Sequence, residues 1–506
     1  MLRTILNTIP RDKDLPERAW TMDVLSRILN GALYEQIAYE FWQEKNDAQE
    51  YVPLRSRRPS VHYNLCRVVV DDSVAVLFSD GHFPSLELDD PVARDNVRLI
   101  AKASQLNACM VEAATIGACG SVAIHFAARK QGNDTYRPFL TVHSTQYLTP
   151  MWQDAAPDTL AGVTQRYKIK GSDLKAKGYT IKSDDLNVTY WFERHWNDVE
   201  ETWFLPYKPE DMHKQGFVKQ RDAVRSVRHD LDFVPWVWIR NLPGKLKLFS
   251  SEAGAPQYSD ADGASTFASL VDWMIEIDYQ LSQGGRGLRY TMDPLLIVKE
   301  PVAQRDEFVR SPANAMILDE GGDAKLLELT GRSFETVMEW VRALRELALE
   351  AAHGNRADPQ KMAAAQSGRA MELMNQGLIW LVDKLRTSYG ECGMLQVARM
   401  MIAAHAKYPL ASNGVTIAPI DPAATPTLNW PPFYALTAQD LSAQAQTMST
   451  LRDAGVISRE TAIKNIAPAY DIEDVAAEMT QIAADRAADV ALMPAAKDAE
   501  TLNVPA

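Results

Sequence analysis

The hydrophobic pattern divides the chain into helical stretches on either side of a β-rich middle. Apolar residues recur at helical spacing from Glu17 to about Asn46, and a second helical region runs from about Pro91 to Ile116 and ends near Gly117. From 139 to 239 the chain is rich in aromatic and β-branched residues, which favour strands. With 506 residues, this mixture predicts an α+β fold of two to four domains.

Several segments of the first half carry more specific predictions. Asn64–Phe78 fits either a buried strand or a buried helix, because a short apolar run does not separate the two. Ser121–Phe126 is predicted to be a strand, and Asn197-Asp198 a hairpin turn within the β-rich region. The stretch Pro150–Phe233 contains no recognisable motif, so its topology is left open.

In the second half, two amphipathic helices bracket a small β-rich module. The first is predicted from about Ala264 to Ser282 and is expected to end at Gly284-Gly285. The second is expected to begin at Ser333, a plausible N-cap. The predicted strands between them are 294–299, 315–318 and 325–328, with a turn at 320–323.

The second of these helices has two distinct faces. Its apolar stripe, at spacings of three and four residues, consists of Val337, Trp340, Val341, Leu344, Leu347, Ala348 and Ala351. Its charged face consists of Glu335, Glu339, Arg342, Arg345, Glu346 and Glu350.

Beyond this helix the pattern predicts a turn-rich loop, a long helix, an extended return and an alanine-rich helical tail. In chain order these are His353–Gln360, Gly368–Ala406 with kinks at Gly377, Gly390 and Gly393, the proline-rich Ile417–Pro432, and Thr437–Val490.

Charge and cysteine content narrow the possible functions. The net charge of −13 argues against a protein that grips DNA, but it permits a conduit that repels phosphates. The four cysteines, which include no CxxC pair, are expected to be reduced and mostly buried, which fits synthesis in a reducing cytoplasm. They are Cys66, Cys109, Cys119 and Cys392. No membrane span or secretory signal is expected, since the apolar stretch Leu395–Ala406 is too short to cross a bilayer.

Catalytic and metal-binding motifs are not found. The sequence contains no phosphate-binding GxxxxGK[ST], no HExxH and no GxSxG. Asp260–Gly263 resembles part of a calcium loop, but the ligand positions on both sides do not fit. His62, His125 and His195 lie beside apolar segments and are expected to be structural. We therefore expect no catalytic residue, no cofactor and no metal.

The order of these parts resembles that of the portal proteins of tailed bacteriophages over roughly residues 17–490. The most specific local match is Asp453–Ala462, with its Ile-Ser-Arg-Glu-Thr-Ala phrase, followed by the acidic Asp471–Asp474. Weaker matches occur in the same order as in the family. They are Asn64–Phe78, Val234–Asn241, Leu270–Asp272 with Asp278, Tyr279 and Ser282, and Ser367–Ala370. The loop after the second amphipathic helix, residues 353–367, differs because it lacks the family's run of glycines.

The resemblance implies a portal-type fold with wing, stem, clip and crown. In this numbering the parts would be wing 1–262, stem helix 263–282, clip 283–331, stem helix 332–352, tunnel loop 353–367, wing 368–435, and crown with tail 436–506.

The resemblance also implies a function. Such a protein is a ring of twelve subunits at one capsid vertex of the virion, through which double-stranded DNA is packaged and ejected without sequence specificity. Its partners are the major capsid protein, the terminase and a head–tail adaptor, and no membrane is involved.

Three groups of residues follow from this resemblance as candidates. Those for DNA contact in the tunnel loop are His353, Asn355, Arg356, Asp358, Lys361 and Gln366. Those for the lumen of the stem are Glu335, Glu339, Arg342, Glu346 and Glu350. Those for the clip and its adaptor contact are Arg286, Arg289, Lys299, Arg305 and Arg310.

Three other readings remain open from the sequence. One is a different connector or adaptor ring of a virion, although such proteins are usually much shorter. A second is a nucleic-acid-processing enzyme with an unfamiliar site. A third is a cellular α+β scaffold, which would be monomeric or dimeric at micromolar concentration.

Overall fold

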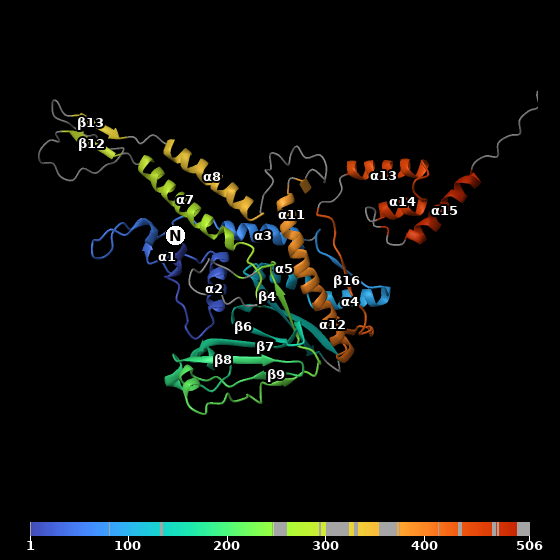
Figure 1. The fold of residues 1–506 in the computed structure, drawn as a ribbon, viewed down its shortest axis with the longest axis horizontal. Helices are drawn as coiled ribbons and strands as arrows, with labels where there is room; N and C mark the ends of the chain where they lie inside the picture. Colours follow the sequence, from blue (N-terminus) through green and yellow to red (C-terminus); the bar gives the residue numbers. More distant parts are fainter. Residues whose placement is uncertain are drawn as a thin grey trace, which may run out of the picture. The chain divides into compact units, whose positions relative to one another are not determined.

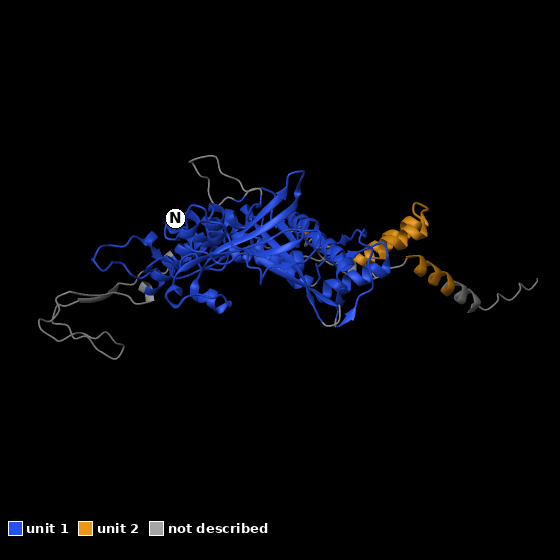
Figure 2. Cartoon of the chain, turned by 90° about the horizontal axis from the view of Figure 1, so that it is seen from below, with its two compact units in different colours: residues 1–356, 377–431 blue, residues 357–376, 432–506 orange. Residues whose placement is uncertain are grey.

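The computed structural model forms two compact units, which Figure 2 colours separately. Unit 1 comprises Met1–Arg356 and Gly377–Pro431, and unit 2 comprises Ala357–Gln376 and Pro432–Ala506. The structure describes residues 2–79, 81–131, 135–244, 246, 261–292, 295–299, 323–327, 332–353, 372–373, 375–412, 414–433, 438–467, 472 and 475–492. The predicted α+β class is confirmed.

The helices and strands follow one another along the chain as Figure 1 labels them. The α-helices are α1 Leu2–Leu6, α2 Glu17–Leu29, α3 Leu65–Phe78, α4 Pro91–Ala103, α5 Leu106–Gly117, α6 Gly171–Ala176, α7 Val271–Met292, α8 Arg332–Ala351, α11 Gln376–Leu385, α12 Leu395–Lys407, α13 Ala438–Asp453, α14 Arg459–Ile466 and α15 Val475–Leu492. The main strands are β4 Ser121–Lys130, β5 Tyr136–Ser144, β6 Leu148–Gln153, β7 Ala156–Lys170, β8 Thr189–Trp196, β9 Glu200–Trp203, β10 Val227–Arg228, β11 Trp236–Arg240, β12 Leu295–Lys299 and β13 Asp323–Leu327. Shorter strands are β1 Tyr39–Glu40, β2 Arg57–Arg58, β3 Ser85–Glu87, β14 Ala411–Ser412, β15 Val415–Thr416 and β16 Thr427–Asn429.

Two antiparallel sheets form the middle of unit 1. One has the order β11-β4-β5, and the other has the order β10-β9-β8-β7-β6, a meander in which neighbours in sequence are neighbours in the sheet. The meander gives residues 150–233 the topology that the sequence left open. The predicted strand at Ser121 and the turn at Asn197-Asp198, between β8 and β9, are confirmed.

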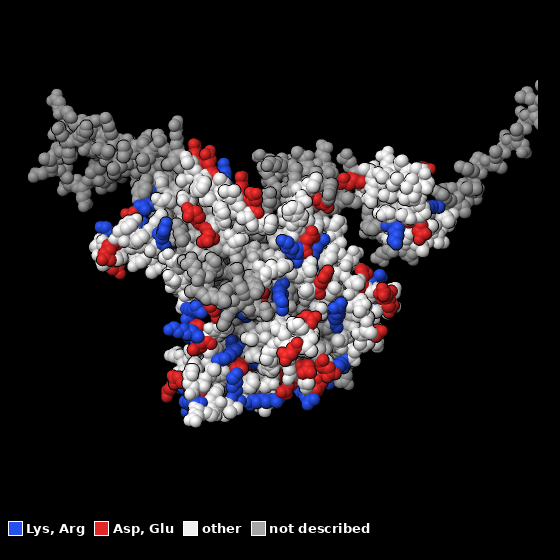
Figure 3. Space-filling view, viewed as in Figure 1, with Lys and Arg blue, Asp and Glu red and all other residues white. Residues whose placement is uncertain are grey.

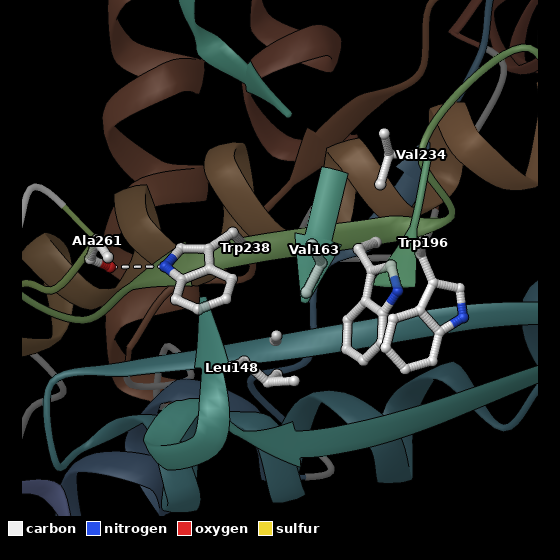
Figure 4. Close-up of a cluster of buried hydrophobic side chains, with 8 residues drawn as sticks. Leu148, Val163, Trp196, Val234, Trp238 and Ala261 are labelled. Carbon is white, nitrogen blue, oxygen red and sulfur yellow. Dashed lines mark hydrogen bonds between the residues drawn. The ribbon is translucent and has the colours of Figure 1, made fainter. Parts of the chain in front are cut away.

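A buried tryptophan cluster joins the two sheets (Figure 4). Trp196 from the meander lies with its ring centre 4.9 Å from that of Trp236 on β11. Trp238 packs in the same cluster, and its indole N–H donates a hydrogen bond of 2.6 Å to the carbonyl of Ala261. His125 packs against Trp236, and loss of water lowers its pKa to about 3, as expected of a structural histidine.

The prediction of one helix from Glu17 to Asn46 is wrong in its second half. Helix α2 ends at Leu29, and Gly31 turns the chain with a φ of +75°. The apolar residues that continued the helical spacing, such as Leu33 and Phe41, are buried from irregular backbone instead. Periodicity therefore identified buried positions correctly but not the backbone that carries them.

Local backbone features determine where helices α3, α4 and α5 begin and end. The ambiguous segment 65–78 is helix α3, whose first turn is capped by the Asn64 carboxamide oxygen accepting from the N–H of Arg67 at 3.1 Å. The predicted helix 91–116 is two helices, α4 and α5, because Gln105 adopts a left-handed φ of +57° between them.

The predicted end of the first amphipathic helix at Gly284-Gly285 is wrong. Helix α7 continues to Met292, and Gly284 is buried at its contact with α8. A Cβ atom at Gly284 would lie 3.0 Å from Cγ1 of Val337. The glycine thus allows close helix packing instead of ending the helix. Helix α8 begins at Arg332, so that Ser333 lies in its first turn and does not cap it.

The remaining predictions of secondary structure are largely confirmed. Strands β12 and β13 pair in antiparallel fashion, and Asp323, the last residue of the predicted turn 320–323, belongs to β13. The predicted strand 315–318 and the rest of that turn lie outside the described residues. The long helix changes to a π-helix over Arg386–Met394, which contains Gly390 and Gly393, while Gly377 lies in the regular helix α11. Unit 2 contains the predicted tail helices α13, α14 and α15. Cys66, Cys109 and Cys119 are buried and unpaired, and Cys392 is exposed.

Arg18 connects helix α2 to the sheet that contains β4 and β5. Its guanidinium forms two hydrogen bonds to the fully buried carboxylate of Asp262 and donates to the carbonyl of Thr145 at 2.6 Å. The hydroxyl of Ser121 also donates to Asp262. Since Asp262 has no access to water, its charge depends on Arg18.

Replacing Arg18 should therefore be strongly destabilising. Arg18→Met would leave the Asp262 carboxylate buried without its cation, and we expect a loss of about 3–5 kcal/mol. Chemical denaturation followed by tryptophan fluorescence measures this loss. Arg11→Met, which breaks an exposed pair with Glu17, serves as the control and should have no measurable effect. Equal denaturation midpoints for both variants would contradict the role assigned to Arg18.

Candidate functional site

Helices α7 and α8 lie side by side and antiparallel (Figure 1). Gly284 of α7 packs against Val337 and Phe334 near the start of α8. At the other end of the pair, Ser269, just before α7, and Ala352, just after α8, line the same cavity. This pair is the predicted stem.

The base of α7 is bonded to the segment that precedes α3. The carboxylate of Asp278 accepts from the N–H of Tyr63 at 2.7 Å and from the hydroxyl of Tyr34 at 2.8 Å. One turn further along, the hydroxyl of Ser282 accepts from the N–H groups of Ser60 and Val61, both at 3.0 Å. These contacts fix the direction of α7 relative to the N-terminal part of unit 1.

The environment of Asp278 perturbs its ionisation. Burial raises the pKa of Asp278 to about 6, and the N–H of Tyr63 and the hydroxyl of Tyr34 oppose the shift only in part. His62 also acts on the carboxyl, in the lowering direction. Burial, and after it the adjacent charge of Asp278, raise the pKa of Tyr34 far above its usual range. Asp278 is therefore partly protonated near neutral pH.

The charged face of α8 is exposed apart from Arg345, which is half-buried. Within the described part of the chain, none of its residues forms an ion pair, although their spacing along the helix would allow it. Mostly acidic side chains line the edge of the molecule over α8 in Figure 3. The five lumen candidates on this face are Glu335, Glu339, Arg342, Glu346 and Glu350.

The apolar stripe of α8 is divided in a way that the sequence pattern did not separate. Val341, Leu344 and Ala348 are buried within unit 1. Trp340 and Leu347, by contrast, are 50% and 49% exposed. The width of the stripe in the sequence already indicated a second contact, because the stripe is wider than contact with one partner helix requires.

The clip candidates within the described residues already have contacts inside the chain. Arg286 forms an ion pair with Glu44, and the guanidinium of Arg289 lies 4.3 Å from the ring centre of Trp42. Both contacts attach the end of α7 to the loop that follows β1. Arg305, Arg310 and the side chain of Lys299 lie outside the described residues.

Of the tunnel-loop candidates, the structure describes His353 alone. It is exposed, lies two residues after the end of α8 and has a left-handed φ of +55°. A cavity of about 260 Å³ adjoins it, lined among others by Ser265, Thr266 and Lys384. The other five candidates, Asn355, Arg356, Asp358, Lys361 and Gln366, lie outside the described residues.

The chain matches the family described as "Phage portal protein, SPP1 Gp6-like" over residues 13–491. It belongs to this family of portal proteins. The resemblance found in the sequence is confirmed, and the protein is a structural component of phage-type virions.

Two other comparisons add little to the portal assignment. No curated protein matches the chain. A solved chain described as "Virion of native gene transfer agent (GTA) particle" is 13% identical, with 79% of this chain and 93% of that chain covered at a TM-score of 0.29. At that score the similarity carries no argument, so the portal assignment rests on the family.

In the described part of the portal chain, no group of three or more His, Cys, Asp and Glu side chains could hold a metal ion. Among the same residues, no helix combines the length and apolar character needed to cross a bilayer.

The raised pKa of Asp278 predicts a pH-dependent stability. Between about pH 4 and pH 6 the folded protein keeps a proton that the unfolded chain releases, so this group's contribution to stability falls as pH rises. A pKa shift from 3.8 to about 6 corresponds to about 3 kcal/mol. In Asp278→Asn, the carboxamide oxygen can accept from Tyr63 and the amide can donate to Tyr34, without a charge.

We therefore expect Asp278→Asn to gain stability relative to the wild type as pH rises from 4 to 6.5. Denaturation midpoints of the two proteins, measured across this range, test the difference directly. Other titrating groups cancel in that difference, because both proteins share them. A constant difference between the two proteins over the whole range would contradict a raised pKa for Asp278.

Proposed function

We propose that the chain assembles into a closed ring of twelve copies at one capsid vertex, with α7 and α8 around a channel for double-stranded DNA. The ring serves packaging and ejection, and it docks the terminase and the head–tail adaptor. The observation that carries this proposal is the division of α8 into three sectors. Membership of the portal family supports it.

A stem helix of a ring needs three different faces. One face packs on the helix partner of its own chain, one borders the channel, and one contacts the neighbouring copy. The α8 residues Val341, Leu344 and Ala348 pack inside the chain. The exposed Trp340 and Leu347 lie in another sector with Ala343 and Ala351, and all four fall within roughly 80° around the helix axis.

Five charged residues occupy the third sector, whereas the half-buried Arg345 lies outside it. Glu335, Glu339, Arg342, Glu346 and Glu350 also fall within roughly 80° of one another. The exposed apolar sector lies between this charged sector and the buried one. Contact of the apolar sector with a neighbouring copy therefore turns the charged sector to the channel, where carboxylates repel phosphates and keep DNA mobile.

The other parts are proposed from the family order. Residues 283–331, which include the end of α7 and the β12–β13 hairpin, form the clip and dock the adaptor. Residues 353–367 form the tunnel loop at the DNA, and 436–506 form the crown. The two sheets and the long helix form the wing against the major capsid protein. Synthesis takes place in the host cytoplasm, before assembly into the virion.

Removing the exposed apolar sector should dissociate the ring. In Trp340→Ser with Leu347→Ser, each interface loses two apolar side chains worth about 2 kcal/mol each when buried. We expect the protein concentration at which half of the rings dissociate to rise at least tenfold, as measured by sedimentation velocity, with unchanged circular dichroism.

The control changes the neighbouring sector of the same helix. Glu339→Ser with Glu346→Ser should leave ring assembly intact, because these side chains face the channel. Rings of unchanged stability in the Trp340/Leu347 variant, or equal losses in both variants, would contradict the assignment of the sectors.

Reversing the charges of the channel sector should convert a repelling lumen into a binding one. We expect Glu339→Arg with Glu346→Arg to bind short duplex DNA at low salt and to release it as salt rises, because each new phosphate contact releases counterions. Fluorescence anisotropy measures this binding. Asp173→Arg with Asp184→Arg, on the exposed surface near α6, adds the same charge outside the stem and is the control. Equal DNA binding by both variants would place Glu339 and Glu346 outside the channel.

A further inference from the structure

Two arginines face each other directly at the end of the β4–β5 hairpin. In the register of this pair Arg129 lies opposite Arg137, so that their Cβ atoms are about 5 Å apart. Both side chains are exposed, and neither forms an ion pair with another described residue. Like charges directly opposite each other destabilise an antiparallel pair. Among the described residues, no anion therefore compensates the two charges at this position.

The arginine pair is held in position by an aromatic ring. The guanidinium of Arg129 lies 4.5 Å from the ring centre of Phe139, which is half-buried on the same face of the hairpin. A cation over a ring retains its outer N–H groups for an incoming acceptor. The guanidinium is thus placed in advance, and an oxyanion such as a carboxylate fits two adjacent guanidinium groups.

A second hairpin of unit 1 carries the opposite charge. The turn between β6 and β7 presents Asp154, and Asp158 follows at the start of β7. Both are exposed, and neither forms an ion pair with any described Lys or Arg. Met151, in the same hairpin, is 42% exposed. Each hairpin tip therefore combines two unpaired charges with apolar surface.

The two tips lie at opposite ends of strand β4. Trp152, beside the acidic turn, has the guanidinium of Arg240 5.4 Å from its ring centre, and Arg240 is paired in register with Ser121. From Ser121 to Arg129 the strand advances by roughly 27 Å, at about 3.4 Å per residue. The arginines and the aspartates of one chain therefore cannot reach one another.

We propose that the two tips contact each other between neighbouring copies, Arg129 and Arg137 of one copy binding Asp154 and Asp158 of the next. A closed ring uses heterologous contacts, in which two different patches of the same chain meet. Complementary patches at opposite ends of one strand satisfy this requirement. The contact also reduces the repulsion between copies. Every copy carries a net charge of −13, so copies repel one another unless opposite charges meet where they touch.

This inference rests on the self-association in the proposed function and adds a second contact to that of α8. It makes ring formation sensitive to salt, since exposed pairs are screened at high ionic strength. The α8 contact, which is apolar, has no such dependence. Varying the salt concentration therefore separates the contribution of the hairpin tips to ring stability from that of α8.

The test exchanges charges between the tips. Arg129→Glu with Arg137→Glu, and separately Asp154→Lys with Asp158→Lys, should each raise the half-dissociation concentration of the ring about tenfold or more at low salt. Combining all four changes should restore assembly, because the pairs then form with reversed polarity. Sedimentation velocity at low and high salt measures each protein.

A matched control removes the effect of total charge. Arg129→Glu and Arg137→Glu combined with Asp173→Lys and Asp184→Lys has the same net charge as the wild type, but its tips do not match, and it should remain impaired. Lys175→Glu with Lys182→Glu, at exposed sites away from both tips, should assemble normally.

The outcomes distinguish this contact from the proposed function. If the wild type forms rings and the tip variants behave like the Lys175/Lys182 control, the tip contact is wrong and the ring stands. Restoration by the mismatched combination would assign the effect to total charge and would also overturn the contact. If the wild type forms no ring under any condition, both the tip contact and the proposed function are wrong.

Discussion

The attachment of α7 to the segment before α3 is the constraint on which the rest of the account depends. Asp278 and Ser282 together accept four hydrogen bonds at the base of this helix, three of them from backbone N–H groups. Because backbone groups cannot change rotamer, these bonds set the direction of α7. Helix α8 packs closely on it through Gly284, so the orientation of every α8 side chain follows from the same attachment. A channel-lining helix needs this kind of fixed orientation relative to the surfaces that join neighbouring copies.

Charge is distributed unevenly over the described residues. In the meander sheet, cations are largely matched within the chain, as Lys168 is by Asp12 and Asp14 and Arg221 is by Glu200. The five lumen candidates on α8, and Arg129, Arg137, Asp154 and Asp158 on the two hairpin tips, form no ion pair with another described residue. In a monomer this would be a small loss of stability at most, because exposed pairs contribute little. In the proposed ring, these charges lie on the surfaces that would meet DNA or another copy.

The hydrophobic pattern followed the buried positions more closely than it followed the ends of the elements. Leu33 and Phe41 continue the helical spacing and are buried, but Gly31 ends the helix before them. Gly284 was interpreted as a helix end, although its role is to let α8 approach, which depends on a partner more than 50 residues later in the sequence. The topology of the meander and the bonds of Asp278 depend on contacts between distant segments, which a single sequence does not show. The charged face of α8 was predictable because it is a local, periodic property.

Among the candidate residues, those chosen from a local helical period were placed more accurately than those chosen from position along the chain. The five lumen candidates lie together on one exposed face, as a helical period requires. Arg286 and Arg289 were assigned to the adaptor contact on position alone, and within the chain they bind Glu44 and Trp42. The exposed half of the α8 stripe was missed because the sequence pattern does not distinguish contact within a chain from contact between copies.

The most direct test of the central claim is electron microscopy of the purified wild-type protein, with two-dimensional class averages of end-on particles. The account predicts closed rings with a central hole and about twelvefold symmetry. Single globular particles at every protein and salt concentration would contradict it.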